Sequence, residues 1–311
     1  MSFNTASLSA YIEDQDFPIV AKMQATSGLA EKANIQVGIK DSSHLQFVDT
    51  SVTFQADSCS PTYADTTAFT QRTITVGGVQ LPEKLCVKDL NGFWLQTKVK
   101  QGAIGDTEMP VEIEGIWLEQ KLNKVKNALA IADFQGDTGS GTNNLSYYDG
   151  LLKLVDADGT VINGNTGGVT VATGVTSANI LDILDGMYSS IPEEIMDEMD
   201  LSLWIPNSWY KLYQVALKNA NLFHYAVSEG EQKLYGTNVA LRPTVGLSGL
   251  DRAILARDSN ITIGMDGAED ADTMEVRLDP VSNKSILFNA TFKRGVQYAF
   301  GSEIVEFTLE V

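Results

Sequence analysis

The sequence predicts an α+β protein, and three observations carry this expectation. Segments in which apolar and polar residues alternate occur in the first third and again in the last quarter of the chain, and this alternation is typical of half-buried strands. Between them, residues 107–134 have apolar side chains at helical spacing. The chain has 311 residues, of which 43% are hydrophobic, enough for a sizeable core in one large domain or two ordinary ones.

The N-terminal segment, up to about Gln36, has short apolar groups without a sustained period. A short helix is expected there only near Ser7–Ile12 or Pro18–Met23, and the remainder is expected to be extended.

The next segment, 45–99, is polar and β-like. Apolar residues alternate with polar ones on both sides of Gly77-Gly78, at Ile74, Val76, Val79 and Leu81. A Gly-Gly pair between alternating segments is a hairpin-turn signal, so we predict a long two-stranded ribbon that turns there. Because an isolated ribbon is only marginally stable in water, it must lie on its own body or on a neighbouring subunit.

A long helix is predicted over about 107–134. Asp106 or Thr107 can cap its N-terminus, and Pro110 suits its first turn. Acidic residues crowd the N-terminal end and lysines the C-terminal end, as the helix dipole favours. One apolar stripe is formed by Leu118, Leu122, Val125 and Leu129. A core helix would share this pattern, but the length favours a spine along one side of the body.

The stretch IADFQGDTGSGTNNLSYYDGLL, residues 131–152, ends this helix. Gly136 and Gly141 have the spacing of a phosphate-binding loop. However, Thr142 stands where the loop needs Lys, and Asp137 adds a negative charge. We therefore expect no nucleotide here.

The segment LLKLVDADGTVI follows. Asp156, Asp158 and Gly159 resemble part of a calcium loop, but Gly167 occupies the position where an EF-hand needs Glu. Asp158-Gly159, between LLKLV and TVI, instead predicts a hairpin turn.

An α/β segment comes next. Ser177 is expected to cap a helix, and LSLWI (201–205) is typical of a buried strand. Asn207 is expected to cap a second helix. The inward faces of the two helices are predicted as Ile180, Leu184 and Met187, and as Trp209, Leu212, Ala216 and Ala220. The acidic PEEIMDEMD between them is expected to face solvent. It is not expected to be a catalytic carboxylate cluster, because it has no nearby base or nucleophile.

The C-terminal part is the clearest β region. NVALRPTV, DRAILARDSNITIGM and TMEVRLDP are strand-like. SILFNATFKRG and the last residues alternate, with one face on a core and one toward water. The inward positions are Ile286, Phe288, Ala290, Phe292, Val305, Phe307, Leu309 and Val311.

The charge balance argues against one class of function. The chain has 22 Lys and Arg against 40 Asp and Glu, a formal net charge of −18. Tight nucleic-acid binding needs a basic surface, because the affinity comes from neutralising phosphates. We therefore expect no tight DNA binding, although an acidic surface can enclose DNA without adhering to it.

No apolar run is long enough to span a membrane, and the N-terminus lacks a secretory signal, so we expect folding in a cytoplasm. Cys59 and Cys86 match no zinc spacing and are expected as two thiols, with their role left open. His44 and His224 are too few for most metal sites and have no catalytic context. The nearest approach to a nucleophile elbow, GLSGL, has its second glycine one place early. The sequence therefore predicts no catalytic, cofactor-binding or metal-ligating residue.

Taken in order, these parts resemble the major capsid proteins of tailed bacteriophages, which have the Hong Kong 97-type fold. The most specific local match is Gly136-Asp137 with Gly139 and Gly141, followed by Gly150-Leu151-Leu152. LSLWIPNSWYKLYQVALKNAN is similar to the family's axial-domain strand and the helix that follows it, and KLYGTNVALRPTVG to its Leu-x-Gly-x-x-Val segment. RAILARDSNITIGMD is similar to the strand that leads back into the peripheral domain. The resemblance implies an N-terminal arm at 1–40, an extended β-hairpin loop at 41–100, a peripheral domain at 101–172 with spine helix 107–134, an axial domain at 173–262 and peripheral return strands at 263–311.

The resemblance also implies a function. The protein would be structural and not an enzyme, and it would self-assemble into hexamers and pentamers of an icosahedral shell around the double-stranded DNA of a tailed phage. Its partners would be other copies of itself with portal, scaffolding and cement proteins. DNA would be packed inside without sequence-specific binding, and no membrane would be involved. The protein would be found in the virion capsid after assembly in the host cytoplasm.

Two family features have no counterpart here. The chain has no room for the N-terminal scaffolding segment that many members cleave, so we expect a separate scaffolding protein or a processed product. Some members form a Lys–Asn cross-link between subunits, but no motif selects a pair among Lys84, Lys88, Asn283 and Asn289.

Two alternatives remain open at this point. An encapsulin-like nanocompartment shell would share the fold but enclose cargo enzymes, and a neighbouring cargo gene would identify it. The second alternative, from another class of protein, is a hydrolase or a β-rich binding protein. Loss of substrate turnover in the variant His224→Ala would favour the enzyme.

Overall fold

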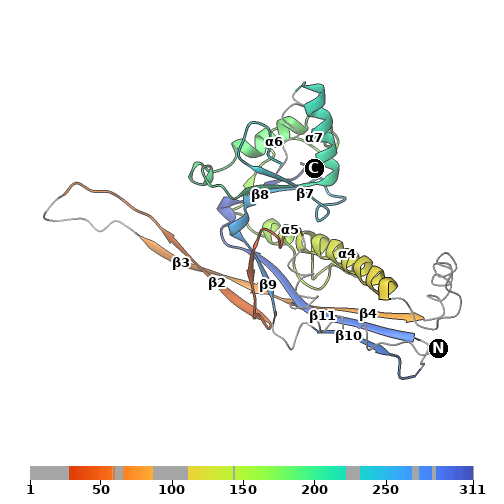
Figure 1. Ribbon diagram of the computed structural model, residues 1–311. Helices are drawn as coiled ribbons and strands as arrows, with labels where there is room; N and C mark the ends of the chain where they lie inside the picture. The colour runs from red at the N-terminus through yellow and green to blue at the C-terminus, as the bar shows by residue number, and fades with distance from the viewer. Residues whose placement is uncertain are drawn as a thin grey trace.

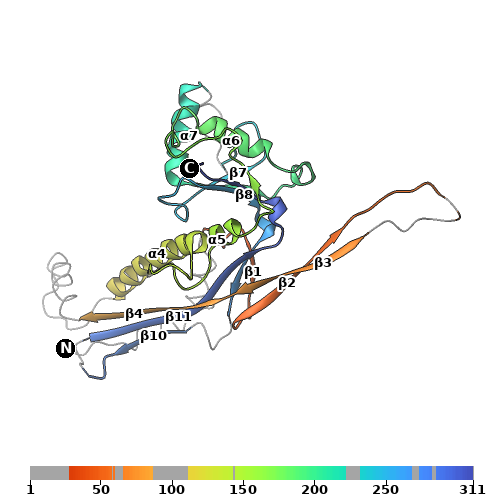
Figure 2. The same ribbon diagram turned by 180° about the vertical axis from the view of Figure 1, so that it is seen from behind.

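The computed structural model describes residues 28–57, 59, 66–86, 111–142, 144–221, 232–267, 273–281 and 285–310. The described elements form two β-sheets, each covered by helices, and a thin ribbon that projects far from both (Figure 1; Figure 2 shows the opposite side). The short helices expected within the first 27 residues lie outside this description, as does His224.

The first sheet has five strands and is organised around its longest one. Its members are β1 (Asn34–Gln36), β4 (Gly77–Cys86), β9 (Ile261–Met265), β10 (Thr273–Leu278) and β11 (Ser285–Tyr298). Antiparallel β4 and β10 flank the first part of β11, and β9 pairs with its last residues. Phe288, Ala290 and Phe292 are buried while the residues between them are only partly covered, which confirms the predicted alternation.

Helix α4 (Val111–Gln135) lies along this sheet (Figure 1). Val125 and Leu129 are buried in one cluster with Phe292 and Val296 of β11, and Leu122 packs against that cluster. The predicted long helix is thereby confirmed, as is its apolar stripe at Leu122, Val125 and Leu129. The predicted caps Asp106 and Thr107, Pro110 and the side chain of Leu118 lie outside the described part of the chain. The helix ends one residue beyond the predicted boundary.

The ribbon consists of β2 (Ser42–Thr50) and β3 (Thr67–Thr75), paired antiparallel from Ser42↔Thr75 to Thr50↔Thr67, and of residues 51–57, which continue the chain from the end of β2. The predicted turn at Gly77-Gly78 is wrong. These glycines begin β4 and pair with Arg294 and Lys293 of β11. Glycine is needed at position 77 for close packing, because a Cβ there would lie 1.9 Å from the carbonyl oxygen of Tyr147.

The second sheet lies under two helices. Its strand order is β5 (Ile162–Asn163), β12 (Val305–Phe307), β8 (Ala253–Arg257), β6 (Leu201–Pro206) and β7 (Ala240–Thr244). Every residue of β6 is buried, as predicted for LSLWI. Helix α6 (Ile180–Ser189) buries Ile180, Leu184 and Met187, and the acids of 193–198 are exposed, both as expected.

Three local predictions for this region are wrong. The cap position before α6 is occupied by Asn179 and not by Ser177. Helix α7 (Asn207–Asn219) begins at Asn207 itself, so its cap position is occupied by Pro206 and not by Asn207. The inward face of α7 contains Trp209 and Ala216 as predicted, but Tyr213 and Leu217 complete it, whereas Ala220 is exposed. The end of the chain also differs, since Glu306 is buried in β12 and pairs with Arg252.

The predicted hairpin at Asp158-Gly159 is also wrong, because LLKLV forms helix α5 (Leu151–Asp156) and not a strand. Leu151, Leu152 and Val155 are buried together, which is the spacing of one helical face. A turn after α5 then leads into β5. The two sheets meet beside α4. There the ring centroids of Phe134 on α4 and Trp204 on β6 lie 5.8 Å apart.

Candidate functional site

The glycine-rich stretch is a tight structural turn. The backbone N–H of Gly150 donates to the carbonyl of Gly136 at 2.8 Å. A Cβ on Gly150 would lie 2.6 Å from the nitrogen of Gly136 and 2.7 Å from the carbonyl oxygen of Phe134. The two glycines therefore let the chain cross itself directly after α4 and begin α5. Their role is close backbone packing at this turn.

The most unusual feature is the ribbon. β2 and β3 form a two-stranded sheet of their own, joined to no other described strand. Large apolar side chains along it face solvent, with exposed fractions of 95% for Phe54 and 79% for Phe69. Val48 and Val52 are exposed as well. In both views the distal half of the ribbon extends away from every other labelled element (Figures 1 and 2).

The base of the ribbon is fastened to the body by a polar cluster. Arg72 of β3 donates from Nη2 to Oδ2 of Asp158 at 2.6 Å. Its guanidinium carbon lies 4.4 Å from the ring centroid of Tyr298 on β11. The hydroxyl of Tyr298 donates to the same carboxylate at 2.8 Å. Three segments distant in sequence thus meet at one carboxylate.

The titration properties of this cluster follow from its contacts. Burial alone would raise the pKa of Asp158, but hydrogen bonds from Thr160, Arg72 and Tyr298 outweigh burial and hold the pKa well below its usual range. Burial and the hydrogen bond to Asp158 raise the pKa of Tyr298 to about 12. At neutral pH the cluster therefore contains a carboxylate, a guanidinium and a neutral phenol.

Further contacts hold the same end of the ribbon. Ile74 is completely buried, and Phe47 packs on Phe300 with ring centroids 5.5 Å apart. Gln297 donates from Nε2 to the carbonyl of Thr73 at 2.9 Å. The ribbon is consequently fixed at its base and unsupported beyond it by the described part of the chain.

A second buried cluster fixes α4 on the first sheet. Arg294 of β11 donates to Asp133 of α4 through Nε and Nη2, each at 2.7 Å, and both side chains are completely buried. The hydroxyl of Tyr148 donates to Asp133 at 2.9 Å. Burial and then the negative charge of Asp133 raise the pKa of Tyr148 well above its ordinary value.

The residues considered from the sequence lie apart. His44 is exposed on β2, 3.1 Å from the hydroxyl of Thr73. Cys59 is exposed and Cys86 half-buried, and both are free thiols. Lys84 pairs with Asp279 at 2.5 Å, and Asn289 accepts a hydrogen bond from Gln80 at 2.9 Å. Lys88 and Asn283 lie outside the described residues.

Two other kinds of site are absent from the described ranges. No three or more His, Cys, Asp or Glu side chains there gather in a way that could hold a metal ion. None of the helices described is both long and apolar enough to cross a membrane.

Sequence reasoning missed the residues that fasten the ribbon. The sequence pattern around Asp158 resembles part of a calcium loop and predicts a turn, and nothing near Arg72 or Tyr298 marks either as its partner. Gly301 carries the one local hint, because a Cβ there would lie 2.2 Å from the hydroxyl of Thr160 and 2.6 Å from Asp158. A glycine can indicate close packing, but it does not name the group that it packs against.

The architecture defines a class of protein: a sheet-and-helix body with a protruding ribbon whose strands pair with no other described strand. No protein-family model and no curated protein matches the chain. Solved structures do match. A chain of the satellite phage P4 procapsid including size determination (Sid) protein superposes with a TM-score of 0.58 at 11% identity, covering 94% of this chain and 99% of that one.

Two further solved structures are similar over nearly the whole length. The capsid of a native GTA particle gives a TM-score of 0.58 at 15% identity, covering 92% of this chain and 91% of that one. The capsid of Myoviridae phage XM1 gives 0.56 at 12% identity and covers 90% of each chain. The chain therefore has the fold of phage capsid proteins, which are structural proteins.

Proposed function

We propose that this chain is the major capsid protein of a tailed bacteriophage and builds the shell of the virion. The similarity to capsid chains supports this proposal because it extends over at least nine-tenths of both partners in each comparison above. A similarity of this length involves most of the chain and not just one common motif.

The ribbon is the observation that carries the proposal. Its two strands have outer edges that no other described strand pairs with, and its exposed apolar side chains gain about 25 cal/mol for each Å² that a partner would cover. Free edges of this kind favour pairing with another chain. Because the ribbon is anchored only at its base, a neighbouring copy is the surface best placed to cover its distal half.

Such a contact is heterologous, since the ribbon of one copy lies on a different surface of the next. Head-to-tail contacts of this kind close into rings when the rotation between copies allows it. We infer that the rings are the hexamers and pentamers of an icosahedral shell. The net charge of −18 suits a wall against which double-stranded DNA is packed without adhering.

The two sheets correspond to the parts that the Hong Kong 97-type fold would have. In this assignment the first sheet with α4 is the peripheral domain, the second sheet with α6 and α7 is the axial domain, and residues 1–40 are the arm. The extended loop corresponds to β2 and β3, while β4 belongs to the peripheral sheet. Portal, scaffolding and cement proteins are the further partners expected, with assembly in the host cytoplasm.

Electron microscopy and mass photometry of the purified full-length protein test this function. The protein is examined over a range of concentrations and salt, alone and co-expressed with the neighbouring genes. We expect rings or closed shells whose amount rises with protein concentration. A monomer that persists under all of these conditions would contradict the proposal. Shells that carry protein cargo and no DNA in the producing host would instead indicate a nanocompartment.

A further inference from the structure

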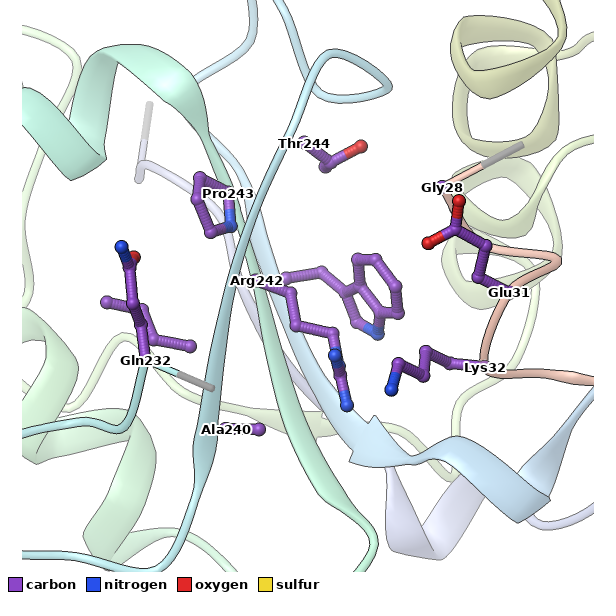
Figure 3. Close-up of a pocket in the computed structure, with 10 residues that line it drawn as sticks. Gly28, Glu31, Lys32, Gln232, Ala240, Arg242, Pro243 and Thr244 are labelled. Carbon is purple, nitrogen blue, oxygen red and sulfur yellow. The ribbon is translucent and has the colours of Figure 1, made fainter. Parts of the chain in front are cut away.

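A pocket of about 390 Å³ lies between the second sheet and the turn formed by residues 28–32. Its walls include Trp204 of β6, Arg242 and Thr244 of β7, and Glu31 and Lys32 of the turn. Figure 3 shows Lys32 and Arg242 reaching into this space from opposite sides, with their charged ends toward one another. The pocket is at the small end of the range for ligand sites.

Trp204 gives the pocket an unused hydrogen-bond donor. The side chain is only 3% exposed, and its Nε1 has no hydrogen-bond partner among the described residues. Its ring is held in place by Phe134 at 5.8 Å and by the guanidinium of Arg242 at 5.7 Å. Because buried indole N–H groups usually have a partner, an acceptor is expected to enter the pocket.

The charges around the pocket indicate what kind of acceptor fits. Arg242 is oriented by Ser202 at 2.7 Å and by Asp258 at 3.1 Å, so that its guanidinium lies at the pocket wall. Glu31 is engaged by Lys126 at 3.3 Å, which places a further cation beside it. In a chain of net charge −18, this pocket brings Lys32 and Arg242 together around one N–H donor. A carboxylate matches both the donor and the charge.

We propose that the pocket receives the carboxylate of an Asp or Glu side chain from a second copy of this chain, with Trp204 Nε1 as donor and with Lys32 and Arg242 supplying the positive charge. The inference rests on the proposed assembly. Charge complementarity favours a second copy, because the chain has 40 acidic residues. Its exposed acids at 193–198 lie on the same half of the molecule as the pocket. The contact would fix the angle between neighbouring copies.

The first experiment measures carboxylate binding by the unassembled subunit. The four tryptophans are labelled with ¹⁵N in the indole, Trp204→Phe assigns the resonance, and sodium acetate is titrated against sodium chloride at constant ionic strength. We expect the Trp204 N–H resonance alone to move and to saturate. Lys32→Gln should weaken acetate binding by about threefold or more, whereas Lys124→Gln, the same charge change at an exposed position on α4, should not. A Trp204 resonance that does not move, or equal effects of the two lysine variants, would overturn the proposal.

The second experiment asks whether a second copy supplies the carboxylate. Ring formation is followed by mass photometry for the wild type and for Trp204→Phe, which keeps an aromatic side chain, although a smaller one, and removes the donor. Circular dichroism verifies that the variant is folded. We expect acetate to raise the protein concentration needed for wild-type rings and to have little effect on the variant, whose rings already need more protein. If rings form equally well in every case, the second-copy occupant is wrong while the proposed function stands. If the wild type forms no rings at all, the proposed function fails and the second-copy occupant fails with it. A shift of the Trp204 N–H resonance with acetate would then indicate only an anion site.

Discussion

Arg294 and Asp133 form a bidentate ion pair in which both side chains are completely buried, with Nε–Oδ1 and Nη2–Oδ2 distances of 2.7 Å. The pair joins the middle of β11 to the last turns of α4, and the hydroxyl of Tyr148 completes the coordination of the carboxylate. A buried charge is tolerated only when its partner and hydrogen bonds are in place. The helix therefore has one permitted position on the sheet.

Removing only the cation of this pair should destabilise the subunit strongly. We expect Arg294→Met to lower the free energy of unfolding by about 3–5 kcal/mol, because it leaves the carboxylate of Asp133 buried without its partner. Urea unfolding of the unassembled subunit measures this change. Arg277→Met is the control, because it makes the same substitution in an ion pair whose two side chains, Arg277 and Glu275, are 61% and 55% exposed, and it should cost at most about 1 kcal/mol.

The triple variant Arg294→Met, Asp133→Leu, Tyr148→Phe should recover part of the loss, because it removes the buried carboxylate and the buried hydroxyl that Arg294→Met alone leaves behind. Equal costs for Arg294→Met and Arg277→Met would show that the buried pair does not stabilise α4 as described.

Asp158 should make the stability of the subunit depend on acid pH. Hydrogen bonds from Thr160, Arg72 and Tyr298 outweigh burial and lower the pKa of this carboxyl in the folded protein. A group of this kind stabilises the fold fully above its unfolded pKa of about 3.9, and the contribution is lost as pH falls toward the lower folded pKa.

We expect Asp158→Asn to cost about 1–3 kcal/mol near neutral pH and progressively less below about pH 4. The measurement is urea unfolding at a series of pH values. Asp197→Asn, at an exposed position, serves as the control and should follow the wild-type curve. Parallel curves for Asp158→Asn and the wild type would mean that the cluster does not favour the carboxylate.

Much of the fold could be predicted from local pattern. The alternation in SILFNATFKRG predicted β11 because α4 covers one face of the sheet, and the apolar run LSLWI predicted β6 because both of its faces are buried. The stripe at Val125 and Leu129 predicted the buried face of α4. In each case a period in the sequence corresponds directly to one face of one element.

Strand pairing and the polar clusters could not be predicted in this way. Gly77-Gly78 has the signature of a turn, but the strand that follows it pairs with residues more than two hundred positions later. LLKLV is short enough to fit either a strand or a helix, and packing under α4 decides for the helix. Arg72, Asp158 and Tyr298 each have an ordinary local context, so their meeting depends on the finished fold.

The crossing of the chain after α4 should tolerate no side chain at Gly150. A Cβ there would lie within 2.8 Å of three backbone atoms in Ala132, Phe134 and Gly136. We expect Gly150→Ala to lower the free energy of unfolding by about 1–3 kcal/mol, because rigid backbone must move. The control is Gly141→Ala in the same turn, where a Cβ meets nothing within 4 Å. Thermal unfolding of both variants tests this, and equal melting temperatures would contradict it.

The exposed phenylalanines of the ribbon should matter for assembly and not for the stability of the subunit. Phe54 and Phe69 are 95% and 79% exposed, so Phe54→Ser with Phe69→Ser should change the free energy of unfolding by no more than about 0.5 kcal/mol. If a neighbouring copy buries them, each contributes about 1.5–3 kcal/mol to the contact, and the double variant should need at least about tenfold more protein to form rings. Mass photometry measures ring formation. Val281→Ser is the matched control, because Val281 is 93% exposed but lies outside the ribbon. Rings that form at the same protein concentration in the double variant and the wild type would show that the ribbon's apolar surface is not the contact between copies.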